Sequence, residues 1–591
     1  MKKFYYPALI ALISVLMSSC SLFTRPDEAD VVILYTTDVH GALLPFNFAA
    51  NRPASHSLAN VSAYVKQERA KSPNLLLFDT GDYLQGQPSL YYYNYVDTAG
   101  AHIFTRMANE LGYDAIGLGN HDIEAGPDLY KKRLPGELRM PILCANAIDT
   151  ATGRPAFKPY AVWEWHNVRV AVLGMITPNI PAWLPASLWP GLEFQDMVEC
   201  ARQWVPYIQE NEHPDILIGL FHAGSDPTFG GSDMDTPKNE NGSVPAAVKV
   251  PGFDLILTGH DHAPAAFEVV NVAGDTVPVL NAGTRAVFVG RADIHLTMDP
   301  QTKKYVKTVK TQNVPMADIP ADTVFTSHYA ADIEAVNSFI DTPIGTLTEP
   351  LDGADTPFGP SAFIDLIQDA QMWATKADVS FASVLSTSAH INAGTITMRD
   401  LFSIYKYENR LFTVRMTGAE IVRYLEFGYG NQFNRMKSPS DELLAYRHDA
   451  NGAILKNQYG SVMQWPTFNY TYAAGINYTV DVSKPAGQRV SVQSLVSGEP
   501  FDPDRFYNVA LNSYQACGGG DFFPKGLGWD RATIESRTVM ASELDVRHYI
   551  ADYIRTLGTV TPRVNGNFRI LPAAWWQTAR AREMADYRDA H

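Results

Sequence analysis

Short apolar runs alternate with helical stretches between residues 31 and 290, and this alternation restricts the fold more than any other feature of the chain. Strands that alternate with helices indicate an α/β sheet covered by helices. The expected strands are VVILY (31–35), LLLF (75–78), DAIGLG (114–119), VRVAVLGMI (168–176), DILIGLF (215–221), DLIL (254–257) and VPVL (277–280). Helical stretches with apolar spacing near 3.6 residues lie between them, at ANVSAYVKQERAK, HIFTRMANELG and MVECARQWVPYIQE.

A second domain follows, because 591 residues exceed what one core holds. The alternation ends between about 299 and 325, where we expect a boundary, and FTSHYAADIEAVNSFIDTP then predicts a connecting helix that ends near Pro343. The predicted limits are 31–320 for the first domain, 321–343 for the linker and 344–571 for the second domain. The second domain mixes helical and strand-like stretches, which predicts an α+β fold. The tail, 572–591, predicts a final amphipathic helix.

The N-terminus has the pattern of a secretory signal. Lys2 and Lys3 precede the apolar run ALIALISVLM at 8–17, and the small residues before Cys20 resemble a bacterial lipobox. This pattern predicts a signal peptide at 1–19, lipid attachment at Cys20 and a tether at 20–30. We therefore expect a periplasmic or cell-surface lipoprotein of a bacterial envelope, anchored to a membrane. The alternative is an ordinary signal peptide with an incidental cysteine.

Composition excludes some partners. The net charge of −16 argues against duplex nucleic acid, which is held by clustered Lys and Arg, and favours a small substrate. No later segment has the roughly 20 apolar residues of a membrane helix. The remaining cysteines, Cys144, Cys200 and Cys517, are few and odd in number, so disulfides are not expected to hold the fold.

Polar motifs begin where five of the apolar runs stop. In an open α/β sheet the carboxyl ends of the strands share one edge, so these motifs are expected to converge. Any one of them alone is more often a polar loop or a helix cap, whereas five in a consistent context favour a metal site. The motifs are TTDVHG after residue 35, DTGDYLQG after 78, GNHDIE after 118, HAG after 221 and TGHDH after 257.

The donors in these motifs are only nitrogen and oxygen, which suits borderline or hard divalent ions. They exceed one tetrahedral site, and a carboxylate can bridge two ions about 3.5 to 4 Å apart, the spacing that holds a phosphoryl group and generates hydroxide near neutral pH. Asp82, in the tight GD turn, is the expected bridge. The candidate ligands are Asp38, His40, Asp82, Asn120, His222, His260 and His262.

The order D-x-H, GD, GNH, a lone H and GH-x-H resembles the calcineurin-like metallophosphoesterases, and more closely the secreted 5′-nucleotidase family. The resemblance spans about 31 to 525 and implies a four-layer α/β metallophosphoesterase domain, two divalent ions (Mn, Zn or Co) and a smaller α+β substrate-binding domain. Within the family, the similarity is greatest to the 2′,3′-cyclic-nucleotide 2′-phosphodiesterase/3′-nucleotidase branch. The stretches that carry it are TTDVHGALLPF, CANAIDTATGRPAFKPY, YKYENRL and NSYQACGGGDFFP.

The same resemblance implies that His121 is a catalytic residue and not a metal ligand. It implies contact of His121 with the phosphoryl group or leaving oxygen, oriented by Glu124, which stands where 5′-nucleotidases place Asp. Asp122 is interpreted as a solvated or capping carboxylate.

The second domain is expected to bind the nucleoside. Aromatic rings stack on any base with about 1 to 3 kcal/mol, and the resemblance implies a sandwich of Phe468 and Tyr514, with Tyr470 as the rival of Phe468. Each ring could instead pack in a core. Asp521 matches the family aspartate that binds a ribose hydroxyl, and Asn409 in YKYENRL matches the Asn of the PFGN-like segment.

One departure bears on the substrate. The family's GGIR segment corresponds to STSAHINAG, so Ser388 stands in place of the arginine. Loss of that guanidinium removes bidentate phosphate recognition. The sequence therefore favours hydrolysis of 2′,3′-cyclic and 3′-nucleotides. The alternatives are a 5′-nucleotidase or UDP-sugar hydrolase, and a non-catalytic nucleotide-binding lipoprotein.

Overall fold

The computed structural model describes residues 25–165, 167–456 and 461–590. Cys20 and the predicted signal segment 1–19 lie outside them. Within the described residues, no helix is long and apolar enough to cross a membrane. Cys144, Cys200 and Cys517 are free thiols.

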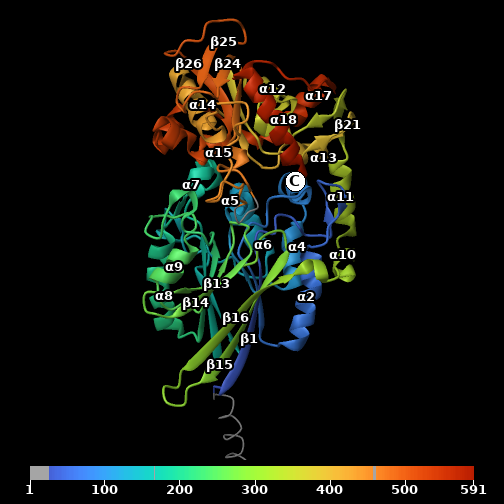
Figure 1. Cartoon of the computed structure of the whole chain (residues 1–591). Coiled ribbons are helices and arrows are strands. Elements are labelled where there is room, and N and C mark those ends of the chain that lie inside the picture. The colour runs from blue at the N-terminus through green and yellow to red at the C-terminus, as the bar shows by residue number, and fades with distance from the viewer. Residues whose placement is uncertain (1–24, 166, 457–460, 591) are drawn as a thin grey trace, which may run out of the picture.

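Two sheets face each other in the N-terminal domain (Figure 1). The first has the order β16-β15-β1-β4-β5, and its strands are β16 (Tyr305–Pro315), β15 (Phe288–Met298), β1 (Glu28–Thr36), β4 (Leu75–Asp79) and β5 (Ala115–Ile116). The second has the order β13-β14-β12-β11-β9-β8, and its strands are β13 (Ala265–Val270), β14 (Thr276–Asn281), β12 (Leu255–Thr258), β11 (Ile216–His222), β9 (Val168–Ile176) and β8 (Tyr160–Trp165). All seven strands expected from apolar runs are present.

Helices cover the outer face of each sheet, which gives four layers. Alternate residues of β1 divide between two cores: Ile33 packs between the sheets, and Leu34 packs outward under helices α2 (Leu58–Lys71) and α4 (Ile103–Leu111). The outer face of the second sheet packs against α8 (Met197–Glu212) and α9 (Ser243–Lys249). The predicted four-layer α/β architecture is confirmed.

The stretch after residue 299 differs from the expectation. It contains β16, which pairs antiparallel with the whole of β15. Most residues of β16 are polar or exposed, because β16 is the edge strand of the first sheet. The strand therefore has no apolar run, and the sequence did not predict it. The predicted connecting helix is two helices, α10 (Thr323–Ser327) and α11 (Ala330–Ile340).

A mixed sheet of order β23-β19-β26-β22-β27 forms the centre of the C-terminal domain. Its strands are β23 (Thr471–Ala474), β19 (Val379–Ser383), β26 (Phe506–Asn512), β22 (Arg410–Thr417) and β27 (Thr538–Asp545). The main helices around it are α12 (Ala362–Thr375), α14 (Gly418–Gln432) and α17 (Val546–Leu557). This is the expected α+β arrangement.

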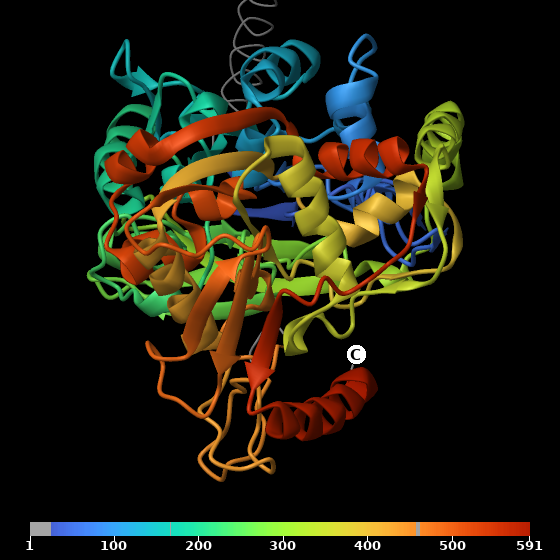
Figure 2. The ribbon, with the colours of Figure 1, turned by 90° about the horizontal axis from the view of Figure 1, so that it is seen from above.

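A smaller sheet, β25 (Val490–Leu495), β24 (Ile476–Asp481) and β29 (Phe568–Leu571), leads to the last helix. The predicted tail helix is α18 (Ala573–Ala590), which packs against β29 and lies at one side of the C-terminal domain in Figure 2. Its buried side is fixed by Glu583, which accepts hydrogen bonds from the backbone N–H groups of Leu443 (2.6 Å) and Leu444 (3.2 Å).

Candidate metal centre

The polar motifs meet at the end of the N-terminal domain that faces the C-terminal domain (Figure 1). Asp38, Asp82 and Asn120 follow β1, β4 and β5 of the first sheet. His222 ends β11 of the second sheet, and His260 follows β12. The expected convergence is present, but the single sheet edge assumed for it was wrong. Two facing sheets, both with parallel strands ending here, supply the groups.

The donors form two clusters that share Asp82. One cluster contains Asp38, His40, Asp82 and His262, and the other contains Asp82, His222 and His260. In each cluster the candidate ligand atoms lie within 4.8 Å of one another. Asn120 joins the second cluster, because its Oδ1 is 3.2 Å from His222 Nε2 and 2.9 Å from His260 Nδ1.

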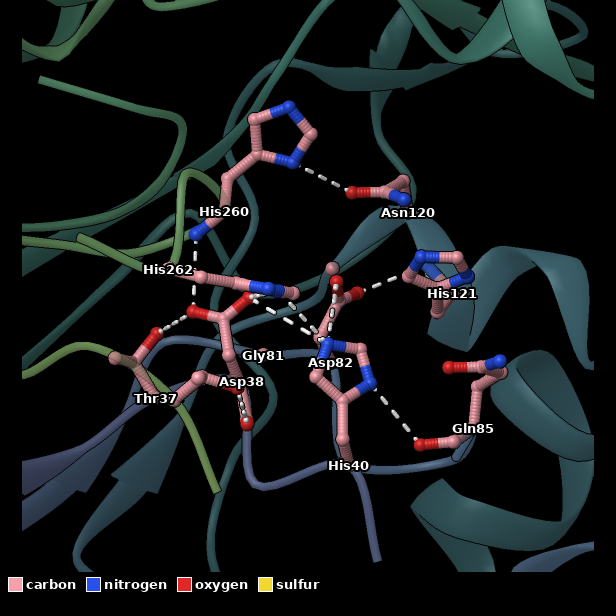
Figure 3. A network of polar contacts seen from close by, with 12 residues as sticks. Thr37, Asp38, His40, Gly81, Asp82, Gln85, Asn120, His121, His260 and His262 are labelled. Carbon is pink, nitrogen blue, oxygen red and sulfur yellow. Dashed lines mark hydrogen bonds and ion pairs between the residues drawn. The ribbon is translucent and has the colours of Figure 1, made fainter. Parts of the chain in front are cut away.

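Each carboxylate has one oxygen held by the backbone and one directed at histidines (Figure 3). Asp38 Oδ2 accepts the His260 backbone N–H at 2.9 Å, and Oδ1 lies 3.3 Å from His262 Nε2. Asp82 Oδ1 accepts the His121 backbone N–H at 2.8 Å. Asp82 Oδ2 lies 3.2 Å from His222 Nε2 and 3.8 Å from His40 Nε2. Asp82 Oδ2 therefore lies between the clusters.

The imidazoles of the first cluster suit a cation. His40 Nδ1 lies 3.1 Å from the Gln85 carbonyl, so an Nδ1–H donates there and leaves the Nε2 lone pair free. That Nε2 faces His262 Nε2 at 3.0 Å. Burial and the facing His262 ring lower the pKa of His40 to about 3. His40 Nε2 is then an acceptor that faces His262 and the carboxylates of Asp38 and Asp82, an arrangement that suits a cation.

The backbone of the site is strained. Five candidate ligands lie in the left-handed region, where a side chain other than glycine costs of order 1 to 3 kcal/mol. They are Asp38 (φ 49°), His40 (44°), Asp82 (62°), His260 (77°) and His262 (56°). Close approach adds to the constraint, since a Cβ at Gly119 would collide with the Asp82 carboxylate. Such strain is typical of functional sites.

His121 lies beside the clusters and makes an ion pair of its own. Its Nδ1 is 2.6 Å from Glu124 Oε2, and both residues belong to the short helix α5 (Asn120–Glu124). Burial alone would lower the pKa of His121, but the Asp82 carboxylate and the Glu124 hydrogen bond outweigh it and raise the pKa to about 10. The imidazole therefore holds a proton next to the shared carboxylate.

Of the two interpretations of Asp122, a solvated or a capping carboxylate, the structure supports capping. Asp122 is fully buried, and its two oxygens accept the backbone N–H groups of Asp82, Tyr83, Leu84 and Gly119 at 2.8 to 3.0 Å. The capping function is confirmed, since Asp122 caps α5, but the same carboxylate also holds the GD turn. The sequence signal was its place one residue after the GNH motif.

Two more carboxylates were missed. Glu240 Oε1 lies 3.1 Å from His260 Nε2, and Glu408 Oε2 accepts the Tyr95 hydroxyl at 3.1 Å across the domain border. No motif marks Glu240, which lies in the loop after β11. Glu408 adjoins Asn409 in YKYENRL, and that adjacency was the available signal.

The predicted nucleoside residues differ in accessibility. Phe468 and Tyr514 are half-buried neighbours with ring centroids 6.1 Å apart at 81°, so the rings meet edge to face and form no parallel sandwich. Tyr470 is fully buried in the core, which excludes its ring from base stacking in this conformation. Asp521 is partly exposed and pairs with Lys525 at 2.9 Å.

Asn409 and Ser388 of the second domain differ in burial. Asn409 is buried, and its Oδ1 accepts the Tyr405 hydroxyl at 3.3 Å. Position 388 carries the exposed hydroxyl of a serine instead of a guanidinium.

The residues fit a pair of divalent ions. Asp38 Oδ1 and His222 Nδ1 are buried and make no hydrogen bond within the described part of the chain. Nitrogen and oxygen donors without thiolate match borderline and hard ions. A calcineurin-like phosphoesterase fold implies such ions, and the two clusters are the candidate places for them.

Comparison with known proteins agrees with the geometry. The sequence matches the profile of the calcineurin-like phosphoesterases over residues 31–264 and that of the 5′-nucleotidase C-terminal domain over residues 343–525. It is 26% identical to a 2′,3′-cyclic-nucleotide 2′-phosphodiesterase/3′-nucleotidase of Yersinia enterocolitica, over 96% of this chain and 92% of the relative. It is 25% identical to a 5′-nucleotidase of Vibrio vulnificus, over 88% of this chain and 91% of the relative.

The fold has close counterparts among solved structures. A Staphylococcus aureus protein assigned as a 5′-nucleotidase superposes with a TM-score of 0.74 at 23% identity, over 92% of this chain and all of the other. That similarity concerns the fold. With both domain profiles matched in order and the donors gathered at one site, the chain belongs to the 5′-nucleotidase family of calcineurin-like metallophosphoesterases and is a hydrolase of phosphoric esters.

Proposed function

We propose that this protein hydrolyses nucleotides, with 2′,3′-cyclic nucleotides and 3′-nucleotides as its leading substrates. The observation that carries the proposal is Asp82, shared by two donor clusters and bonded to the backbone of His121. The Yersinia relative, named for this activity, and the exposed Ser388 in place of a phosphate-binding arginine both support the choice of substrate.

Seven side chains would hold two ions. The first site would use Asp38, His40 and His262, the second Asn120, His222 and His260, and Asp82 would bridge them. When bound, such ions polarise the phosphoryl group and activate water for attack on phosphorus. Mn, Zn and Co suit these ligands.

The chain's own groups complete the reaction. His121, held by Glu124 at 2.6 Å, would stabilise the phosphoryl group or donate its proton to the leaving oxygen. Phe468 and Tyr514 would bind the base, and Asp521 would bind a ribose hydroxyl. Asn409 would belong to the same substrate-binding site. We place the domain limits at 31–320 and 344–571, with 321–343 as linker and 572–591 as tail.

A hydrolysis panel tests the proposal. With 2′,3′-cyclic AMP, 3′-AMP, 5′-AMP and UDP-glucose, we expect the first two to react fastest, and chelation to abolish turnover until Mn, Zn or Co is restored. Preference for 5′-AMP would instead assign the activity of the Vibrio relative. Full turnover after chelation, or no turnover on any substrate, would refute the proposal.

We further propose export and lipid attachment at Cys20, on the strength of the N-terminal pattern. Cells fed radiolabelled fatty acid should label the parent protein but not Cys20→Ala. Equal labelling of both, or of neither, would contradict it.

A further inference from the structure

His260 is contacted on three sides. Its Nδ1 faces Asn120 Oδ1 at 2.9 Å within the second cluster, and its Nε2 lies 3.1 Å from Glu240 Oε1. The indole of Trp183 stacks on the ring face, with centroids 5.4 Å apart and planes inclined by 24°. Trp183 and Glu240 belong to none of the five strand-end motifs.

The contact with Glu240 decides which nitrogen can bind a cation. A neutral imidazole has one N–H donor and one lone pair. A carboxylate is a stronger acceptor than an amide oxygen, so the single hydrogen of the neutral ring lies on Nε2 towards Glu240. The lone pair then remains on Nδ1, which faces Asn120 Oδ1, itself a candidate ligand of the second cluster with Asp82 and His222. Carboxylates that accept from a metal-binding histidine fix its tautomer and its orientation.

The contact with Trp183 fixes the ring plane. Trp183 ends α7 (Ile180–Trp183), which packs against α15 (Ser513–Ala516) of the C-terminal domain. The Arg531 guanidinium donates a hydrogen bond to the Pro181 carbonyl in the same helix. The stacking surface for His260 is therefore itself held by the second domain, at the border visible in Figure 1.

We propose that Glu240 and Trp183 are positioning residues that hold His260 with Nδ1 directed into the second cluster and so set the affinity of the second ion. The proposal rests on the metal assignment in the proposed function. Glu240 acts through the hydrogen bond to Nε2, and Trp183 prevents rotation of the ring away from Asp82.

Metal titration of the full chain tests the proposal. Equilibrium dialysis against Mn²⁺ should give two ions per parent chain, and Glu240→Ala should bind one of them about 10 to 100 times more weakly, the usual effect of losing such a partner. Trp183→Ala should act in the same direction. Glu240→Gln, which keeps an accepting oxygen, and Trp183→Phe, which keeps a stacking ring, should recover part of the affinity.

Two controls separate positioning from general damage. Glu268→Ala removes a carboxylate that is exposed on β13 and should leave both ions unchanged. The melting temperature of each chelated variant reports the fold without metal, and a purely structural role would lower it without weakening one ion selectively. Parent-like binding of both ions by Glu240→Ala and Trp183→Ala would overturn the proposal.

Dialysis measures metal binding without nucleotide hydrolysis. Failure of this inference can therefore be distinguished from failure of the proposed function. A parent that binds two ions but hydrolyses no nucleotide would refute the function alone, and the variants would still decide the role of Glu240 and Trp183. A parent that hydrolyses nucleotides, with variants that bind both ions normally, would refute the positioning role alone.

Discussion

At the scale of single residues, His121 and Asp82 are adjacent but have different expected roles. His121 offers no lone pair to a metal, because its raised pKa of about 10 keeps both ring nitrogens protonated and Nδ1–H donates to Glu124. Asp82 Oδ2, by contrast, lies between both clusters. Substitution should therefore separate loss of chemistry from loss of metal.

His121→Ala should reduce kcat by about 10² to 10⁴, the usual contribution of a positioned acid or base, while the protein keeps its metal. Metal analysis beside steady-state kinetics measures both quantities. Asp82→Asn is the matched comparison and should lose metal as well as activity. Loss of an ion from His121→Ala would make His121 a ligand.

At the scale of elements, the two turns that carry Asp82 and Asn120 depend on one buried side chain. Asp122 Oδ2 accepts from the backbone of Asp82 and Gly119, and Oδ1 accepts from Tyr83 and Leu84. An amide in its place would turn an NH₂ group towards two of these N–H donors.

We expect Asp122→Asn to lower the free energy of unfolding by about 1 to 3 kcal/mol or more, since a buried donor left without an acceptor costs that much. Chemical denaturation of the chelated protein measures it. Asp128→Asn is the control, because Asp128 is exposed and its carboxylate pairs with the exposed Lys132 at 2.6 Å. Equal stability of the two variants would contradict the role given to Asp122.

Elements were predictable where periodicity was strong. The runs VRVAVLGMI and LLLF are buried on both faces and became β9 and β4, because continuous apolar runs of strand length have few other solutions. The polar edge strand β16 gave no such signal. Motif residues such as Asp38 and His222 were visible in sequence, whereas Glu240 meets His260 only through the folded loop after β11.

At the scale of the whole molecule, the domain border contains a buried titratable carboxyl, that of Glu408. Tyr95 of the N-terminal domain donates to Glu408 of the C-terminal domain at 3.1 Å. Burial raises the pKa of Glu408 to about 8, with Glu124 adding to the rise and Arg547 opposing it. The folded state therefore favours a protonated carboxyl at this contact.

The raised pKa predicts how stability depends on pH. The stabilising effect of a carboxyl whose pKa is higher in the folded state is complete below its unfolded pKa and lost as pH rises through the folded value. The melting temperature of the parent should therefore fall relative to Glu408→Gln between about pH 5 and pH 8. Parallel pH profiles for the two proteins would show that Glu408 is ionised in the folded state.

In the proposed function, the two domains would bind different parts of the substrate. The seven candidate ligands and His121 all belong to the N-terminal domain, and the aromatic pair Phe468 and Tyr514 belongs to the C-terminal domain. In the described conformation the two rings meet edge to face, so a base lies between them only if one ring turns. Gly519 lies against the Tyr514 ring, where a Cβ would occupy the space of that ring.

Phe468→Ala or Tyr514→Ala should raise KM for 2′,3′-cyclic AMP, because each loses about 1 to 3 kcal/mol of stacking, which corresponds to about 5- to 150-fold. Bis-p-nitrophenyl phosphate carries no base and needs only the metal clusters, so its hydrolysis should hardly change. The measurement is the change in KM for 2′,3′-cyclic AMP divided by the change in KM for bis-p-nitrophenyl phosphate. A general effect of the substitution on the folded protein would change both values and leave this ratio the same. Equal damage to both substrates would mean that these rings support the fold and that the base is bound elsewhere.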